Sequence, residues 1–263
     1  VFLFGVLSVY SVSAQSKQGR DIQNFDKSWR FIKQDAPGAE NPAFDDSQWR
    51  KLDLPHDWSI EGPYDQNNPT GSGGGYLPAG IGWYRKSFTM GAADAKRKVS
   101  IEFDGVMSNS EVWINGFYLG KRPYGYVSFA YDMTGHLNFG GKPNIIAVKV
   151  DNSVQPASRF YTGSGIYRHV HLISTGNTHF DQWGVYIKPL QVTKQKATIH
   201  VEAKVDNDSG TDGAYTLQTT VIDPAGKIVK TFASKQTVAN GQTVTYIQDI
   251  QVATPQLWDI ENP

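Results

Sequence analysis

The residues that could do chemistry lie in short stretches, and none of these stretches forms a recognisable catalytic set. Thr162-Gly163-Ser164-Gly165 lacks the residue between glycine and serine that a G-x-S-x-G nucleophile elbow requires. The glycine-rich run at 71–75 has no following Lys-Ser or Lys-Thr pair, so it is not a phosphate-binding loop. The carboxylates are dispersed, and their spacing identifies no acid–nucleophile pair for glycoside hydrolysis. We therefore predict no catalytic residue in this chain.

Residue types that bind metals are scattered in the same way. The chain has no cysteine and six histidines, which removes thiolate nucleophiles and thiolate metal sites from consideration. His169 and His171 would share one face of a strand, but no third ligand is near them in sequence. A solvent-facing polar edge is the favoured interpretation of this pair, and we expect no metal site and no cofactor in this chain.

One loop does combine residue types that suit a sugar. Arg159, Phe160 and Tyr161 follow a strand pattern that ends at Asp151-Asn152. Sugars present apolar C–H faces and rings of hydroxyl groups, so their sites combine aromatic platforms, planar multi-donor groups and paired acceptors. A second polar and aromatic cluster, Pro55-His56-Asp57-Trp58, also lies where an apolar run ends.

Both clusters have a purely structural interpretation as well. Arg159 could form a local salt bridge, and Phe160, Tyr161 and Tyr167 could belong to the core, because buried aromatic residues are commoner than ligand platforms. The residue types alone therefore do not choose between a sugar-binding role and a structural role for these side chains.

The elements that must position these loops are β-strands. Alternating runs recur at 98–105, 110–120, 144–150, 198–205 and 215–223, separated by turn residues as in β-sandwiches. Asn115-Gly116 is the strongest short hairpin signal, because a type I′ turn needs positive φ at both central residues. A second hairpin is expected around Asp223-Pro224-Ala225-Gly226. The sequence predicts an all-β protein.

Four large side chains are assigned to the core from these patterns. We expect Phe103 and Trp113 to share a buried face opposite Glu102 and Glu111. Trp29 and Trp49 belong to framework segments at the start of the first domain, and we expect them to be buried as well.

Composition bounds the organisation of the chain. Its 263 residues exceed the usual roughly 100–200 residues of one domain, so two domains are expected, with a boundary near 174–184. The formal net charge is zero, which argues against nucleic acid as a partner. Residues 1–15 are apolar, end in small residues and are too short to span a bilayer, so they are interpreted as part of a secretory signal peptide.

The segment 59–82 is the one long stretch without a strand pattern. A loop of that length inside a compact domain is usually either functional or disordered. Its glycines favour mobility, whereas its tyrosines could grip a ligand. A disordered loop and a functional loop are therefore equally favoured.

Several long motifs together resemble glycoside hydrolase family two, and specifically the N-terminal sugar-binding domain of bacterial β-galactosidases. They are LDLPHDWSIEGPY (52–64), GWYRKSF (82–88), FDGVMSNSEVWINGFYLGKRPYGYVSFAYDMT (103–134) and NIIAVKVDNSVQPASRFYTGSGIYRHVHL (144–172). The resemblance implies a galactose-binding-like jelly-roll sandwich at 22–177. It also implies an immunoglobulin-like sandwich at 180–263, which we expect to be truncated before its final strand.

The resemblance also implies a function for the whole protein. In that family a TIM barrel, absent from this sequence, carries both catalytic glutamates, and a loop of the first domain lines its sugar subsite. The matching loop makes Arg159 the expected sugar contact, with Asp151 and Asn152 second and His56 and Asp57 third. The fragment itself is expected to be inactive and to pack against its own barrel. A barrel-bound metal and a homo-oligomer stay open.

The leading hypothesis is therefore the non-catalytic N-terminal part of an exported, retaining β-galactosidase-like enzyme, periplasmic or extracellular. A stand-alone carbohydrate-binding module is the first alternative, and an adhesive pair of β domains is the second. The choice of β-galactoside over β-glucuronide or β-mannoside rests on the motifs alone.

Overall fold

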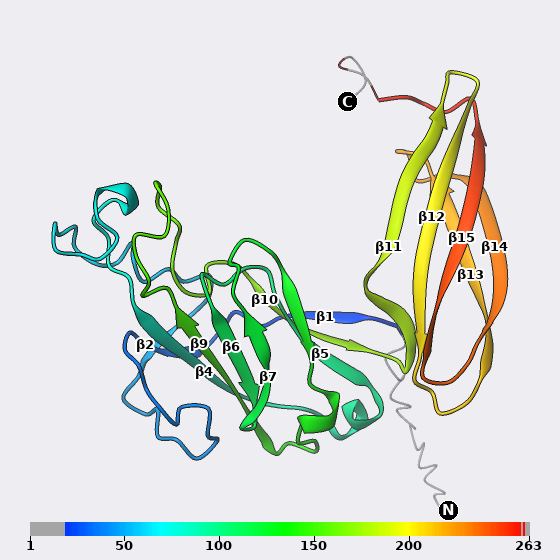
Figure 1. Cartoon of the computed structure of the whole chain (residues 1–263). Helices are drawn as coiled ribbons and strands as arrows, with labels where there is room; N and C mark the ends of the chain where they lie inside the picture. Colours follow the sequence, from blue (N-terminus) through cyan, green and yellow to red (C-terminus); the bar gives the residue numbers. More distant parts are fainter. Residues whose placement is uncertain (1–18, 259, 261–263) are drawn as a thin grey trace, which may run out of the picture.

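The protein forms two β-sandwiches joined near residue 176 (Figure 1). The computed structural model describes residues 19–258 and 260. The all-β prediction is confirmed, because only three short 3₁₀ turns interrupt the strands of this part of the chain: η1 (Ser72–Gly74), η2 (Ala92–Lys96) and η3 (Thr134–His136).

The first sandwich packs a four-stranded sheet against a six-stranded sheet. In order, the smaller sheet contains β1 (Asp21–Asn24), β10 (Val170–Thr175), β5 (Lys98–Phe103) and β8 (Phe129–Asp132). The larger sheet contains β3 (Arg50–Leu52), β2 (Trp29–Ile32), β4 (Ile81–Thr89), β9 (Pro143–Asp151), β6 (Ser110–Ile114) and β7 (Phe117–Arg122).

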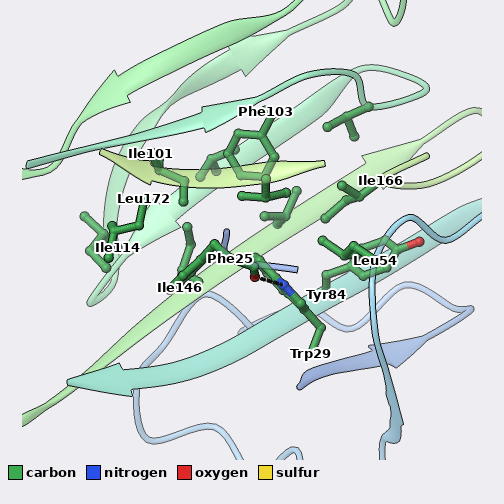
Figure 2. Close-up of a cluster of buried hydrophobic side chains, with 14 of the residues drawn as sticks. Phe25, Trp29, Leu54, Tyr84, Ile101, Phe103, Ile114, Ile146, Ile166 and Leu172 are labelled. Atoms are coloured by element: carbon green, nitrogen blue, oxygen red, sulfur yellow. Dashed lines mark hydrogen bonds between the residues drawn. The ribbon is translucent and has the colours of Figure 1, made fainter. Parts of the chain in front are cut away.

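The main core lies between these two sheets and follows from strand alternation. Strand β5 has a strict period of two, so Ile101 and Phe103 point inward while the polar residues between them point outward. They meet Ile146 from the opposite sheet (Figure 2). Trp29 is fully buried in the same core, and its indole Nε1 donates to the Phe25 carbonyl at 2.9 Å. The core assignments of Phe103 and Trp29 are confirmed.

Trp113 was expected beside Phe103, and this prediction is wrong. Residues two apart on a strand share a face, so Trp113 lies on the side of Glu111, on the outer face of the six-stranded sheet. There it stacks on Trp83, with ring centroids 5.4 Å apart, in a smaller cluster that also buries Trp49. Trp49 is buried as predicted, outside the main core.

Both predicted hairpins form. Asn115 and Gly116 have φ values of 51° and 82° and connect β6 to β7, as a type I′ turn requires. Asp223 and Gly226 punctuate the turn between β13 and β14, where the Gly226 amide donates to the Asp223 carbonyl at 2.9 Å.

The second sandwich has three strands in one sheet and two in the other. The larger sheet holds β11 (Thr178–Val192), β12 (Lys196–Asn207) and β15 (Gln242–Ala253). The smaller holds β13 (Gly213–Ile222) and β14 (Ile228–Val238). Its core contains Ala203, Val205, Leu217, Val238 and Tyr246.

Polar contacts join the two sandwiches. Arg20 donates to the Gln182 side chain at 2.7 Å. Lys98 of the first sandwich lies 3.0 Å from Asp208 of the second and 3.6 Å from its own neighbour Asp132. Strands of the two sandwiches separate between Thr175 and Thr178, while the exact domain limits of 22–177 and 180–263 stay predictions.

The signal-peptide prediction rests on residues 1–15, which lie outside the described residues. Within residues 19–258 and 260, no helix has the length and apolar character needed to cross a membrane.

Truncating a buried phenylalanine should lower the stability of the first sandwich far more than truncating an exposed one. Phe103→Ala should lower the free energy of unfolding of the first sandwich by about 3–5 kcal/mol, because it removes a fully buried ring and leaves a cavity. The exposed Phe160→Ala is the matched control and should change it by less than about 0.5 kcal/mol. Urea denaturation followed by tryptophan fluorescence measures both, and equal losses would contradict the assignment of the core.

Candidate functional site

Three loops meet at one end of the first sandwich (Figure 1). We call them the His56 loop (53–61), the glycine loop (62–80) and the Arg159 loop (152–166). The glycine loop ends where β4 begins, and the Arg159 loop starts where β9 ends; these strand ends are paired, Ile81 opposite Asp151. Two loops that are far apart in sequence therefore leave the sheet side by side.

Backbone hydrogen bonds then join the three loops. The Asn152 amide donates to the Gly80 carbonyl at 3.0 Å, and the His56 amide donates to the Ile166 carbonyl at 2.8 Å. The Gly73 backbone lies so close to Ser158 and Arg159 that an added Cβ would sit 3.1 Å from the Ser158 carbonyl oxygen. The predicted site residues are thus brought into one loop cluster.

Gly165 is the residue that allows this close packing. Its φ of 82° lies in the left-handed region, and an added Cβ would lie 2.8 Å from the His56 carbonyl oxygen. Only glycine combines that backbone conformation with that approach. The glycines of the Arg159 loop thus bring its second half onto the His56 loop.

Asn152 braces the cluster from beneath. Its side chain is buried, accepts from the Gly80 amide at 2.9 Å and donates to the Ser164 hydroxyl at 2.6 Å. The Ser164 hydroxyl is in turn 2.5 Å from the Ser59 hydroxyl. With these partners inside the protein, Asn152 links all three loops, and its geometry gives no support to a direct sugar contact.

Asp151 is also engaged locally. Its Oδ1 accepts from the Ser153 amide at 2.9 Å and from the Ser153 hydroxyl at 2.6 Å. This Asx-type turn starts the Arg159 loop. The residue is half-buried at the end of β9, so it shapes the loop in this structure.

His56 lies under the cluster, with a side chain that is 6% exposed. Its Nδ1 is 2.7 Å from the Tyr84 hydroxyl, and its Nε2 is 3.3 Å from Glu61 Oε2 without the alignment of a hydrogen bond. Burial lowers the pKa of His56 below its ordinary value, although Glu61 opposes that shift. The ring is therefore neutral at pH 7 and supports the loops from inside.

Asp57 and Tyr161 face each other across the cluster. The Tyr161 hydroxyl donates to Asp57 Oδ2, and Asp57 Oδ1 accepts from the Ser59 amide at 2.9 Å. Burial, reinforced by the hydrogen bond to Asp57, raises the pKa of Tyr161 well above its ordinary value. Tyr161 therefore stays a neutral donor that holds the two loops together.

Arg159 and Phe160 differ from the bracing residues because they point outward. Phe160 is 61% exposed and Arg159 is exposed. Among the residues that the structure describes, no hydrogen bond or ion pair engages the Arg159 guanidinium. The interpretations of Arg159 as a local salt bridge and of Phe160 as core find no support in this geometry.

Sequence reasoning did not single out Tyr124 and Tyr126, which are exposed aromatic residues near the Arg159 loop. Tyr126 is exposed, lies 5.7 Å from Tyr124 ring to ring, and donates its hydroxyl to the Thr162 carbonyl at 3.2 Å. Tyr64 of the glycine loop is exposed too. The Tyr-Gly-Tyr at 124–126 was a visible signal, because such residues at a strand end suit a sugar face. We call Tyr64, Tyr124, Tyr126, Phe160 and Tyr161 the aromatic rim.

Glu61 was also missed, and it fastens the His56 loop to the sheet. Both of its carboxylate oxygens accept from the Arg50 guanidinium, at 2.6 and 2.8 Å. This bidentate pair lowers the pKa of Glu61 to about 2, with burial opposing the shift.

The glycine loop also has a defined course, in which the Thr70 hydroxyl donates to the Leu77 carbonyl at 2.8 Å.

The lowered pKa of Glu61 predicts a pH-dependent contribution to stability. A carboxyl whose pKa is lower in the folded state stabilises the fold above its unfolded pKa, and this contribution is lost as pH falls toward the folded value. Glu61→Gln should therefore lower the melting temperature of the first sandwich at pH 7, and the difference should shrink between about pH 4.5 and pH 2. Calorimetry of both proteins across that range measures this. A difference that is independent of pH would contradict the role of the ion pair.

Comparisons with known proteins agree with this architecture. Residues 22–176 match the family model "Glycosyl hydrolases family 2, sugar binding domain", and residues 178–263 match "Glycosyl hydrolases family 2". The chain is 46% identical over 244 residues to "Beta-galactosidase BoGH2A" of Bacteroides ovatus, covering 93% of this chain and 29% of that protein. It is 39% identical over 255 residues to "Putative beta-glucuronidase" of Formosa agariphila, covering 97% and 23%.

Solved structures show the same relationship. A glycosyl hydrolase family 2 member from Bacteroides cellulosilyticus superposes with a TM-score of 0.86 at 36% identity, over 92% of this chain and 32% of that one. A β-glycosidase from Bacteroides vulgatus gives 0.83 at 41% identity, over 92% and 30%. This chain spans less than a third of each of these four proteins. With both sandwiches matched by its models, the chain belongs to glycosyl hydrolase family 2.

Proposed function

We propose that this chain is the N-terminal, non-catalytic portion of an exported glycosidase that hydrolyses terminal β-galactosides with retention, and that Arg159 contacts the bound sugar. The observation that carries the proposal is the unengaged Arg159 guanidinium beside the exposed aromatic rim, on loops braced from beneath by Asn152. A planar group with five donors, flanked in sequence by aromatic residues, suits the paired hydroxyls and apolar C–H face of a sugar.

Catalysis belongs to the part of the protein outside this chain. Retaining hydrolysis needs two carboxyl groups about 5–5.5 Å apart, one as nucleophile and one as acid/base. Among the described residues around Arg159, Asp57 is bound to Tyr161, and Glu61 is bound to Arg50. Both carboxylates therefore hold loops in place. A catalytic barrel packed against the loop cluster would receive Arg159 at its rim.

The β-galactoside is preferred because the 46% identical relative is named a β-galactosidase. Other relatives are named β-glucuronidases, so the substrate is tested directly. Comparing hydrolysis of p-nitrophenyl β-galactoside and β-glucuronide by the full-length protein measures the preference, and a higher kcat/KM for the glucuronide would overturn this part of the proposal. Export rests on the apolar segment 1–15.

Removing the Arg159 side chain in the full-length protein should weaken binding of the transition state without affecting the fold. Arg159→Ala should lower kcat/KM by about 10-fold, because one or two hydrogen bonds are worth roughly 0.5–1.5 kcal/mol each. The melting temperature should stay unchanged, since the guanidinium has no partner among the described residues. The exposed Arg168→Ala is the matched control. An unchanged kcat/KM in Arg159→Ala would contradict the proposal.

Titration of the 263-residue chain distinguishes the alternative of a stand-alone carbohydrate-binding module. Its share of the sugar site is too small to overcome the entropy of immobilising a sugar, so calorimetry with galactose should detect no binding. Micromolar to millimolar binding that disappears in Arg159→Ala would favour the module instead.

A further inference from the structure

A row of three cationic side chains crosses the outer face of the six-stranded sheet. Lys51 of β3 is paired with Arg30 of β2, and Arg30 is paired with Arg85 of β4. Paired residues of neighbouring strands point to one face, and this face is the outer one because the adjacent Trp29 and Tyr84 lie in the main core. Like charges placed directly opposite each other destabilise a sheet, so the row needs anionic partners.

Asp46 supplies only part of the compensation that this row needs. Its Oδ1 lies 3.2 Å from Arg30 Nε, and its Oδ2 accepts from Arg85 Nε at 2.8 Å. Two guanidinium groups thus share one carboxylate. Lys51 is exposed and has no hydrogen bond or ion pair within the described part of the chain. Three positive charges against one negative charge leave a net charge of about +2 on the row and Asp46.

The segment 33–49 covers the buried end of the row. Arg85 is 1% exposed, and its Nη1 donates to the carbonyls of Ala39 and Asn41. Its Cζ also lies 5.6 Å from the ring centre of Phe44. Arg30 uses its Nε and Nη1 to contact the same segment, whereas its Nη2 has no hydrogen bond to any described residue. Arg30 and Lys51 therefore keep donors that are free for a ligand.

A cavity of about 400 Å³ lies between this segment and the sheet. Pro42 and Phe44 of the segment and Ile145 of β9 give it an apolar wall. Its charged lining residues are four cations and one carboxylate, namely Arg30, Lys51, Arg85, Lys86 and Asp46. A cavity of this volume is in the range of small-molecule sites, roughly 300–1,000 Å³.

Lys86 is the one of these cations that does not belong to the row. It follows Arg85 on β4 and therefore points to the opposite face. There its ammonium donates to the carbonyls of Phe25 and Lys27, at 2.9 and 2.7 Å. The charge that faces the cavity is therefore that of the row and Asp46.

We infer that this cavity binds a small organic anion whose carboxylate, phosphate or sulfate group is held by Lys51 and Arg30, with its body against Pro42, Phe44 and Ile145. Ammonium and guanidinium donors form charge-assisted hydrogen bonds to oxyanions. A ligand with one or two negative charges offsets the charge that Asp46 leaves uncompensated. The apolar wall gives the rest of the ligand a surface, which a bare inorganic ion would not use. The inference does not depend on the proposed glycosidase activity.

A purely structural role explains Arg85 but not the rest of the row. Arg85 fastens the segment 33–49 to the sheet through backbone carbonyls and Asp46. That role requires neither a third cation at Lys51 nor an unengaged Nη2 on Arg30. An anionic ligand gives both of them a partner and removes the repulsion along the row.

Isothermal titration of the 263-residue chain tests the chemistry of the ligand. The probes are glucose 6-phosphate, inorganic phosphate and glucose, because the phosphate group carries about −1.5 to −2 charges at pH 7. Glucose 6-phosphate should bind most tightly, and glucose should not bind. Raising NaCl from about 20 mM to about 500 mM should weaken binding at least about 5-fold, since salt screens the charges.

Two outcomes of this titration would contradict the inference. Binding of glucose as tight as that of glucose 6-phosphate, or no binding of either phosphate, would overturn the anion site. Inorganic phosphate that binds as tightly as glucose 6-phosphate would overturn the organic body of the ligand and assign the cavity to a free oxyanion.

A matched pair of lysine variants locates the site. Lys51→Gln should raise the Kd for glucose 6-phosphate by about 10-fold, because it removes a charged donor. Its melting temperature should stay unchanged, since Lys51 has no polar partner among the described residues. Lys196→Gln removes the same charge from an exposed position of the second sandwich and should leave the Kd unchanged. Equal effects of the two variants would overturn the site.

Arg30→Gln provides a second variant in the row. It should also raise the Kd by about 10-fold, because it removes a second charged donor, and its melting temperature reports any loss of the contacts with Asp46. Restoring the melting temperature is not needed for the test, since binding is measured below the unfolding transition. A Kd unchanged in both Lys51→Gln and Arg30→Gln would overturn the assignment of the anionic group to this row.

Discussion

The antiparallel pairing of β4 with β9 is the constraint on which the loop cluster depends. Its register places Ile81 opposite Asp151, so the end of the glycine loop and the start of the Arg159 loop emerge from adjacent strands. Backbone hydrogen bonds of a ladder fix positions to within a fraction of a residue. A slip by one residue would turn every side chain of β9 to the other face and change which residues of the two loops lie side by side.

The loop cluster divides its polar residues into two groups. Asn152, Asp57, His56 and Glu61 have partners inside the protein, and their hydrogen bonds and ion pairs give the loops a defined shape. Arg159 and Phe160 point outward, and the rest of the aromatic rim is exposed, although Tyr161 also donates to Asp57. This division is physically reasonable, since a site placed by supporting hydrogen bonds loses less entropy when a ligand binds. Of the five predicted sugar contacts, Asp151, Asn152, His56 and Asp57 therefore hold the loops in place. The fifth, Arg159, is the residue that these loops present.

The two sandwiches differ in how completely they bury their inner faces. The first closes a continuous core between four and six strands, while among the described residues β13 pairs with β14 alone and Val185 and Ile187 of β11 are exposed. A strand edge of this kind would favour association between chains if it were left uncovered.

Local patterns determined the strands, the hairpins and much of the core, because alternation and turn chemistry are properties of neighbouring residues. Asn115-Gly116 and the alternation of β5 are examples. The error at Trp113 came from the same kind of pattern, since its two-residue spacing from Glu111 already placed both on one face. Motifs spread over 52–172 were enough for the resemblance to family 2, because they include most of β4, β6, β7, β8, β9 and β10.

Only the tertiary structure decided which polar residues are available to a ligand. The sequence shows Asp57 and Tyr161 as separate candidates, 104 residues apart, and it contains no record of the hydrogen bond between them. Whether a side chain is engaged depends on contacts between distant segments, which the register of β4 and β9 sets. The sequence alone therefore determined the fold class and the family, whereas the packing of three loops left Arg159 outward and engaged Asn152, His56 and Asp57 within the protein.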